Sequence, residues 1–261
     1  MQTVLTAFGR LARAELHAKL ANRTEFLLIG LGVFATSLAT AATLYLLAGQ
    51  QGSIAGWNRY DLIFLQGFML LAYSLQSGMF NAQFMLSRWL RDGSYLRTYL
   101  RPVHPLLQLA LERFHPQGFL VMAFGLGYCV LAVWAGGTAQ PWWFWPAFAL
   151  LWLLAAVTFT AINLMAAASA FWFGEAWPTQ SLVGRVTDMA RYPLDMLPWL
   201  PRQCFMWLPL GALGYWPGRA LLHGTPLLPV LGYMLLACAV SVWGAHRLWH
   251  AGMRHYEGAG G

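Results

Sequence analysis

The chain has 261 residues, of which 59% are hydrophobic and only 10% are charged. A soluble globular domain averages about 25% charged residues, so a soluble chain of this composition would expose extensive apolar surface to water. The net charge of +7 does not indicate nucleic-acid binding, because the basic residues are dispersed among short loops and include a single lysine, Lys19. The composition excludes an ordinary soluble domain and predicts a membrane protein.

The positions of the 16 basic residues predict how the chain crosses the membrane. Between successive long apolar stretches they number 4, 1, 5, 0, 3, 1 and 2, so alternate segments hold 14 of the 16. Lys and Arg are retained in cytoplasmic loops. We therefore expect an all-α integral membrane protein with six transmembrane helices and both termini in the cytoplasm. Attraction to anionic cytoplasmic lipid is an expected by-product.

The N-terminal segment, 2–25, gathers its apolar residues on one half of a helical wheel, with Arg10, Arg13 and His17 at or beyond the edge. This pattern predicts an amphipathic helix lying in the membrane interface. The run that follows, 26–48, is uncharged and long enough to cross about 30 Å of hydrocarbon. We expect it to remain as an anchor, because no small-residue cleavage site follows it.

The second expected span, 62–86, carries a stripe of polar and aromatic residues that fall within about 120° of each other at 100° per residue. A polar stripe faces protein or water rather than lipid. Packing between helices is one interpretation, since amides and hydroxyls bridge spans, and a substrate-lining surface is the other. The candidate substrate-lining residues are Gln66, Tyr73, Gln76, Ser77 and Phe80.

The basic segment after this span predicts a short cytoplasmic helix at about 92–102. Asp92 or Ser94 can cap the helix and Pro102 stops it. The apolar surface of this helix is expected to be exposed, with Arg97 and Arg101 beside it, which suits docking into a cytoplasmic partner. An ordinary interfacial helix is the alternative. The apolar surface comprises Tyr95, Leu96, Tyr99 and Leu100.

The remaining spans are expected at about 118–136, 142–173, 196–214 and 226–245. The fourth exceeds the length of a crossing, so it should tilt or project into the cytoplasm. A second basic inner segment begins at Gly174. Arg202 is expected to snorkel to the inner surface from the first turns of the fifth span. Residues 215–222 should form a re-entrant helix in the outer leaflet. The whole chain, 1–261, is expected to form a single transmembrane domain.

The sequence lacks the motifs of several catalytic classes. It contains no G-x-x-x-x-G-K-[S/T] loop, H-E-x-x-H or C-x-x-C. No charged residue lies in the middle of an expected span, which disfavours ion-coupled transport. His246 and His250 share a helix face, but two histidines are too few for a metalloenzyme site. The three cysteines are widely spaced, so we expect neither a disulfide nor a metal site.

Six short motifs are distributed along the chain. They are Arg59-Tyr60-Asp61-Leu62, Leu65-Gln66-Gly67, Arg91-Asp92-Gly93, Leu100-Arg101-Pro102, Arg191-Tyr192-Pro193 and Tyr256-Glu257-Gly258-Ala259-Gly260. Together they resemble a bacterial branch of the type-2 ABC transporter permeases that includes viologen-exporter-like permeases. The resemblance covers nearly the whole chain and is most specific from the Asp-Gly pair to the Arg-Pro pair.

This resemblance implies a permease subunit, not an enzyme, of an ATP-driven exporter in the bacterial inner membrane. The implied partners are a dimer of a separate ATPase, which binds ATP and Mg, a second permease, expected to form a heterodimer, and membrane lipid. No cofactor is expected on this chain. The resemblance also implies that the helix at 92–102 is the coupling helix that seats in the ATPase. Its coupling residues would be Asp92, Gly93, Tyr95, Leu96, Arg97, Tyr99, Leu100, Arg101 and Pro102.

The implied function is movement of a hydrophobic or amphipathic substrate by alternating access. An ATP-independent membrane enzyme or scramblase-like protein is the alternative from another class, and a purely structural membrane subunit is a third hypothesis. Aromatic richness suits cations, lipids and peptides alike, so the sequence leaves the substrate open.

Overall fold

The computed structural model of the chain describes residues 23–95, 115, 117–137 and 140–256. This part of the chain is helical, apart from loops and one isolated β-bridge between Ile54 and Trp57, which confirms the expected all-α class for it. Five of its helices are long and apolar enough to cross a membrane. The expected interfacial helix before Arg23, the coupling helix beyond Tyr95 and the tail motif from Glu257 lie outside the described residues.

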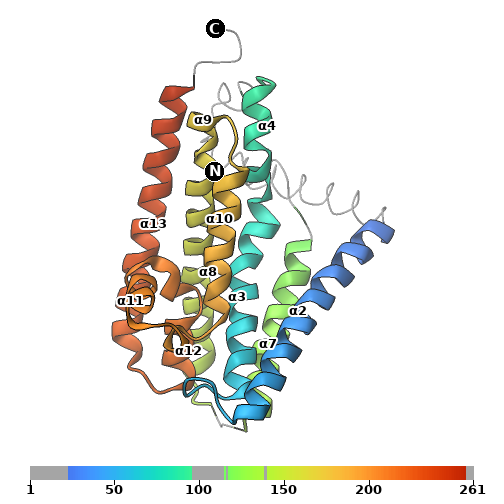
Figure 1. Cartoon of the computed structure of the whole chain (residues 1–261), viewed down its shortest axis with the longest axis vertical. Coiled ribbons are helices and arrows are strands. Elements are labelled where there is room, and N and C mark those ends of the chain that lie inside the picture. The colour runs from blue at the N-terminus through green and yellow to red at the C-terminus, as the bar shows by residue number, and fades with distance from the viewer. Residues whose placement is uncertain (1–22, 96–114, 116, 138–139, 257–261) are drawn as a thin grey trace.

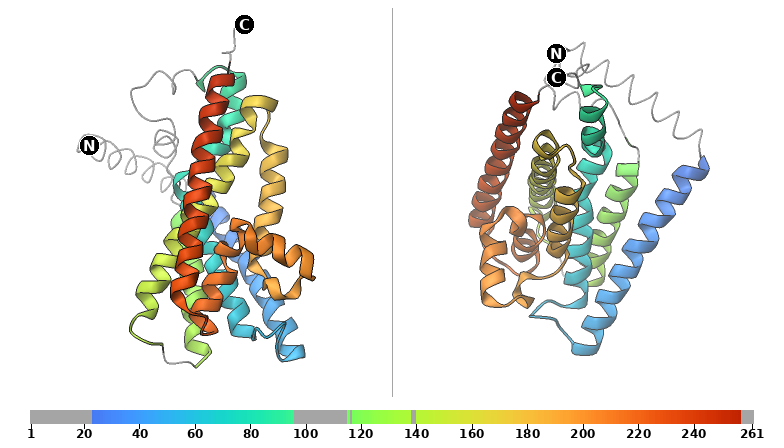
Figure 2. Two further views of the ribbon diagram at one scale, coloured as in Figure 1. Left: turned by 90° about the vertical axis from the view of Figure 1, so that its left-hand side faces the viewer. Right: turned by 45° about the horizontal axis from the view of Figure 1, so that its top comes forward.

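The helices form an elongated bundle in which α2, α3, α7 and α8 alternate in direction, and α13 runs in the same direction as α8 because the chain returns between them through α10, α11 and α12 (Figure 1). α2 leans away from the bundle toward its N-terminal end, as Figure 1 and the right view of Figure 2 show. With η for short 3-10 helices, the elements are α2 (Arg23–Gln51), α3 (Arg59–Met79), η1 (Asn81–Met85), α4 (Leu86–Arg91), α7 (Gln117–Ala135), α8 (Phe144–Ala168), α9 (Ala170–Phe173), α10 (Trp177–Asp188), η2 (Met189–Arg191), η3 (Leu194–Met196), α11 (Trp199–Trp207), η4 (Pro209–Leu213), α12 (Tyr215–Leu222) and α13 (Leu227–His255).

Two of the long helices, α3 and α8, form the centre of the bundle. In the most apolar stretch of each, 78% of α3 and 61% of α8 is buried, against 22% of α2 and of α13 and 28% of α7. The outer helices expose many aliphatic and aromatic side chains, such as Leu31 on α2 and Leu236 on α13. Contiguous apolar surface of this kind is stable in contact with lipid rather than water.

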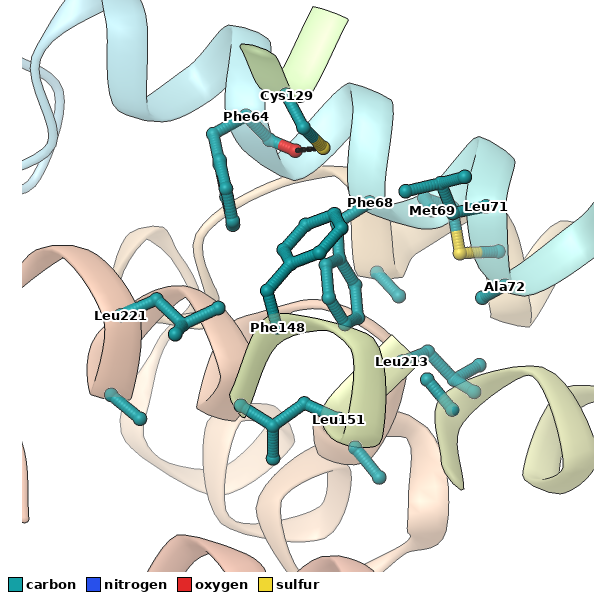
Figure 3. Close-up of a cluster of buried hydrophobic side chains, with 14 of the residues drawn as sticks. Phe64, Phe68, Met69, Leu71, Ala72, Cys129, Phe148, Leu151, Leu213 and Leu221 are labelled. Carbon is teal, nitrogen blue, oxygen red and sulfur yellow. Dashed lines mark hydrogen bonds between the residues drawn. The ribbon is translucent and has the colours of Figure 1, made fainter. Parts of the chain in front are cut away.

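Aromatic rings fill the core where α3 meets α8. Phe64 and Phe68 of α3 stack with 6.0 Å between ring centroids, and Phe148 of α8 contacts both rings edge-on. Figure 3 shows these rings packed above Leu213 of η4 and beside Leu221 of α12. The short helices therefore cover the α3–α8 core at the end of the bundle where α3 begins.

Glycines bring α3 and α7 into backbone contact. A Cβ placed on Gly118 of α7 would lie 2.4 Å from the Cα of Gly78, and one on Gly125 would lie 2.8 Å from the carbonyl oxygen of Gly67. Small residues allow this close approach between membrane helices. Close to the contact between Gly67 and Gly125, the buried Cys129 thiol donates to the carbonyl of Phe64 at 3.6 Å (Figure 3).

The second expected span, 62–86, is not one continuous α-helix. α3 ends at Met79, and η1 separates it from α4. In a continuing α-helix the carbonyl of Gly78 would accept from the N–H of residue 82, but here it accepts from the backbone N–H of His115 at 2.8 Å. This competing bond from the start of the next transmembrane segment accounts for the break.

The fifth expected span, 196–214, is likewise not one helix. Its longest element, α11, has nine residues and measures about 14 Å, less than half of the hydrocarbon thickness. Leu208 has an extended backbone, as residues before proline prefer, and Pro209 starts η4. α12 has the range expected for the short helix at 215–222, and its depth in the membrane remains a prediction.

Candidate functional site

A cavity of about 490 Å³ lies between α3, α8 and α10. Four of its lining residues come from α3 and η1, two come from α8, and the others come from α10 and η2. The lining residues are Met69, Tyr73, Gln76, Phe84, Phe159, Asn163, Trp177, Gln180, Ser181, Gly184, Thr187, Asp188 and Arg191. The wall therefore combines aromatic rings, amides, hydroxyls and an ion pair.

α10 contributes the most polar wall because its polar residues share one helical face. Gln180 and Thr187 are seven residues apart and lie on one side of α10, Asp188 follows Thr187, and Arg191 adds a charge from η2. The start of α10 is fixed by two bonds: the backbone N–H of Ala176 donates to the Ser87 hydroxyl at 2.9 Å, and that of Trp177 donates to a carboxylate oxygen of Glu175 at 3.2 Å. Figure 2 shows α10 running beside α8 toward the short helices.

Two amides in the cavity wall have unused hydrogen-bonding atoms. Gln76 is 1% exposed and Gln180 is 9% exposed, and within the described part of the chain Oε1 of Gln76 and Nε2 of Gln180 have no hydrogen-bond partner. An unmatched buried polar group costs about 1–3 kcal/mol. A polar ligand group or water that bonds these atoms would recover this free energy.

The same cavity holds an ion pair and an aromatic edge. Arg191 donates to Asp188 at 2.9 Å, so the two charges of this wall balance each other. Tyr73 of α3 packs edge-on against Phe159 of α8, with 5.8 Å between ring centroids. A few placed polar groups among apolar and aromatic side chains are typical of sites for small molecules.

The structure separates the five residues that the sequence grouped as substrate-lining. Tyr73 and Gln76 line the α10 cavity, whereas Phe80 lines an apolar cavity between α3, α8 and α13. Ser77 donates its hydroxyl to the Ser74 carbonyl at 3.2 Å and lines neither cavity. Gln66 is fully buried, and neither amide atom has a hydrogen-bond partner among the described residues. The polar stripe of α3 is divided between different surroundings because several helices, including α10 and α13, lie around α3.

Sequence reasoning missed the part of the cavity that α8 and α10 supply. The signals were present: Asn163 is an isolated amide in a long apolar run, and the polar residues of α10 have helical spacing. The arginines after Gly174 predict a basic inner segment instead of a cavity wall. The missed residues are Asn163, Gln180, Ser181, Thr187, Asp188 and Arg191.

The described start of the expected coupling helix is anchored to the bundle. Tyr95, expected to be exposed, is only 1% exposed. Its ring lies edge-on to Phe171 of α9 and to Tyr256, which follows α13, with 5.6 Å between centroids in each case. The Tyr256 hydroxyl donates to the Leu90 carbonyl of α4 at 3.4 Å. Tyr95 is buried because packing its large ring against aromatic rings from two other segments is more favourable than leaving it exposed to water.

The two other described coupling residues form a turn. The Asp92 carboxylate accepts from the backbone N–H of Ser94 at 2.9 Å, and Gly93 has φ +71°, a conformation that favours glycine. Asp92 therefore supports a turn, as Asx side chains commonly do. Leu96, Arg97, Tyr99, Leu100, Arg101 and Pro102 lie outside the described residues.

An exposed ion pair joins this turn region to the start of α10. Arg91 donates to Glu175, and hydrogen bonds from Arg91 and from the Trp177 backbone lower the pKa of Glu175. A carboxyl group with a lowered pKa contributes stability above its unfolded-state pKa and loses that contribution as the pH falls through its folded-state value. The pair therefore stays formed at neutral pH.

A second polar network lies at the opposite end of α3. The Asp195 carboxylate accepts from the Trp57 indole N–H and the Tyr215 hydroxyl, both at 3.0 Å, and pairs with Arg202. Trp57 immediately precedes Asn58, the N-cap of α3. Breaks in the chain therefore bring Arg202 to a carboxylate at the end of the bundle where α3 begins and not beside α4, and its snorkelling to the inner surface stays a prediction.

These features define a multi-pass helical membrane protein with a polar cavity against its central helices. The family model described as ABC-2 family transporter protein matches residues 33–260, and the chain belongs to this family. No curated protein and no solved structure is found to match it. The chain is accordingly a transporter permease subunit, from a family that lacks its own nucleotide-binding domain and normally works with an ABC ATPase.

Proposed function

We propose that this permease subunit exports a hydrophobic or amphipathic substrate from the bacterial cytoplasm by alternating access, powered by a separate ATPase dimer. The observation that carries the proposal is the cavity between α3, α8 and α10, whose volume of about 490 Å³ suits a small molecule. Its aromatic rings would contact the apolar part of the substrate, and Gln76 and Gln180 would bond its polar part. The motifs shared with the viologen-exporter-like branch favour lipophilic cations as the first substrates to test.

The proposed topology has six crossings, with the fifth made in pieces. The segment from Trp177 to Thr225 starts next to Ser87, close to α4, through the bond from Ala176. It reaches the other end of α3 at Gly218, where an added Cβ would lie 3.0 Å from the Trp57 ring. Irregular backbone at membrane depth is tolerated where it is buried or lines a cavity. A sixth crossing by α13 would then return the C-terminus to the cytoplasmic side, and α12 would be the re-entrant element.

Power transmission is proposed to pass through the segment 92–102 into the bundle. Tyr95 contacts α9 and Tyr256, and the turn at Asp92 continues directly from α4. A force applied to this segment by the ATPase would therefore reach the ends of three membrane helices. A second permease subunit, forming a heterodimer with this chain, would complete the pathway.

The cavity is tested by Gln76→Ala, with Ser77→Ala on the same helix as the matched control. After methyl viologen transport by the native complex has been measured in proteoliposomes, Gln76→Ala should raise the substrate concentration for half-maximal ATPase stimulation about fivefold, the effect of one lost hydrogen bond. Ser77→Ala should leave it unchanged. If the substrate concentration for half-maximal stimulation is the same for the native protein and both variants, this face of α3 serves helix packing and not substrate binding.

The docking role of the coupling segment is tested by Leu96→Asp and Arg97→Glu. Each should remove copurification of the ATPase in mild detergent, because each alters the proposed contact surface, whereas Arg185→Glu, an exposed position on α10, should not. Normal copurification of either coupling variant contradicts the docking role. If the native chain copurifies with neither an ATPase nor a second permease, the ATP-independent alternative is favoured.

A further inference from the structure

We propose that the apolar groove between α3, α8 and α13 binds an acyl chain of one anionic phospholipid, whose headgroup contacts His246 and Arg247. The groove has a volume of about 580 Å³. Leu75 and Phe80 form one wall, Val242 and Trp243 the other, and Ala161 of α8 lies between them. The surface is almost entirely apolar, which matches a hydrocarbon chain and leaves a polar headgroup to bind at one end.

The position of this groove along α13 places its polar end at the membrane surface. Residues 227–246 cover about 30 Å at 1.5 Å per residue, which equals the hydrocarbon thickness. α13 begins at Leu227, at the end of the bundle where α3 begins (Figure 1). His246 and Arg247 therefore lie at the level of the lipid headgroups near the α4 end, while Ala239 and Val242 lie at the level of the acyl chains.

The charge at this level favours an anionic headgroup. α13 contains no acidic residue, and its last three turns carry His246, Arg247, His250, Arg254 and His255. The Arg247 guanidinium lies 5.3 Å from the ring centroid of Trp243, a distance at which a cation is attracted to the ring face. This contact holds the positive charge beside the groove wall. Basic pockets between membrane helices on the cytoplasmic side bind anionic lipid headgroups.

The groove is separate from the substrate cavity. Thr160 and Ala161 of α8 line the groove, whereas Phe159 and Asn163 line the cavity beside α10. A lipid could therefore remain bound while substrate moves, and it would fill the space that separates α3 from α13. The proposal depends on the membrane location of the chain and not on the transported substrate.

Native mass spectrometry of the purified permease tests this proposal with phosphatidylglycerol and phosphatidylcholine of identical acyl chains. The native chain should retain phosphatidylglycerol in preference to phosphatidylcholine. Arg247→Gln should weaken phosphatidylglycerol binding about fivefold, and Arg185→Gln, the same charge change on α10, should not. Equal retention of the two lipids by the native chain overturns the anionic assignment.

The groove itself is tested by Ala239→Phe, because Ala239 lines it from an exposed position where a larger side chain does not disturb the core. This change should reduce retention of phosphatidylglycerol, while Leu236→Phe, on an exposed part of α13 outside the groove, should not. Native-level retention by Ala239→Phe overturns the groove as the site. If Ala239→Phe retains the lipid but no longer forms a dimer, the occupant of the groove is a second copy of the protein, and the proposal is also overturned.

Discussion

Gly125→Val is expected to prevent α3 and α7 from packing and to leave little correctly folded protein. A Cβ at this position would lie 2.8 Å from the carbonyl oxygen of Gly67 and 2.9 Å from the backbone nitrogen of Leu71. Overpacking against movable side chains costs about 1–3 kcal/mol. Here the obstacles include backbone atoms of the most buried helix, so α7 would have to move away along much of its length.

The measurement is the yield of monodisperse protein by fluorescence-detected size-exclusion chromatography, together with its thermal unfolding midpoint. Gly127→Val is the matched control, because it makes the same change two residues away on an exposed face of α7 with no heavy atom within 4 Å of the added Cβ. The control should behave like the native protein. Similar yield and midpoint for Gly125→Val would show that α3 and α7 do not pack through their glycines.

Hydropathy was sufficient to predict the long helices, because contact with lipid requires about 20 consecutive apolar residues whatever the neighbouring helices do. The expected span at 118–136 nearly coincides with α7, and α13 begins within one residue of the expected 226. The same reasoning failed between Gly174 and Leu213. Helices in this stretch are short and packed against protein, so their polar residues face a cavity or each other and the hydropathy of the segment falls.

The site was only partly predictable for a related reason. The polar stripe of α3 correctly identified a helix that faces protein, but it could not show which helices cover each side. Tyr73 and Phe80 are seven residues apart and would lie on similar sides of a continuous helix, but α3 ends at Met79 and the two residues line different cavities. This division depends on where α10 and α13 pack, which is information that one helix does not contain.

Replacing Asp195 with alanine should lower the thermal unfolding midpoint strongly, because three partners converge on its carboxylate. Trp57 is fully buried, and its indole N–H would lose its acceptor together with the Tyr215 hydroxyl. Arg202, whose side chain is 37% exposed, would keep its charge without its described partner. Removing one member of a buried ion pair costs about 3–5 kcal/mol. Because Arg202 is partly exposed, we expect the lower value, about 3 kcal/mol, or about 6–12 °C for a chain of this size.

Three further variants separate the contributions to this loss. Asp195→Asn should lose less than Asp195→Ala, since an amide oxygen still accepts from one donor. Adding Arg202→Met to Asp195→Ala should recover part of the loss, because the unpaired cation is then removed. Glu175→Gln, which breaks the exposed ion pair at the other end of the bundle, should change the midpoint little.

The double variant decides between two origins of this stability. If it is more stable than Asp195→Ala alone, the main loss is the uncompensated charge of Arg202, and the carboxylate serves to neutralise a partly buried cation. If it is no more stable, the loss arises from the hydrogen bonds to Trp57 and Tyr215, which join the α2–α3 loop to α12. An unchanged midpoint in Asp195→Ala would contradict both, and the broken segment between α10 and α13 would then be held by its apolar contacts alone.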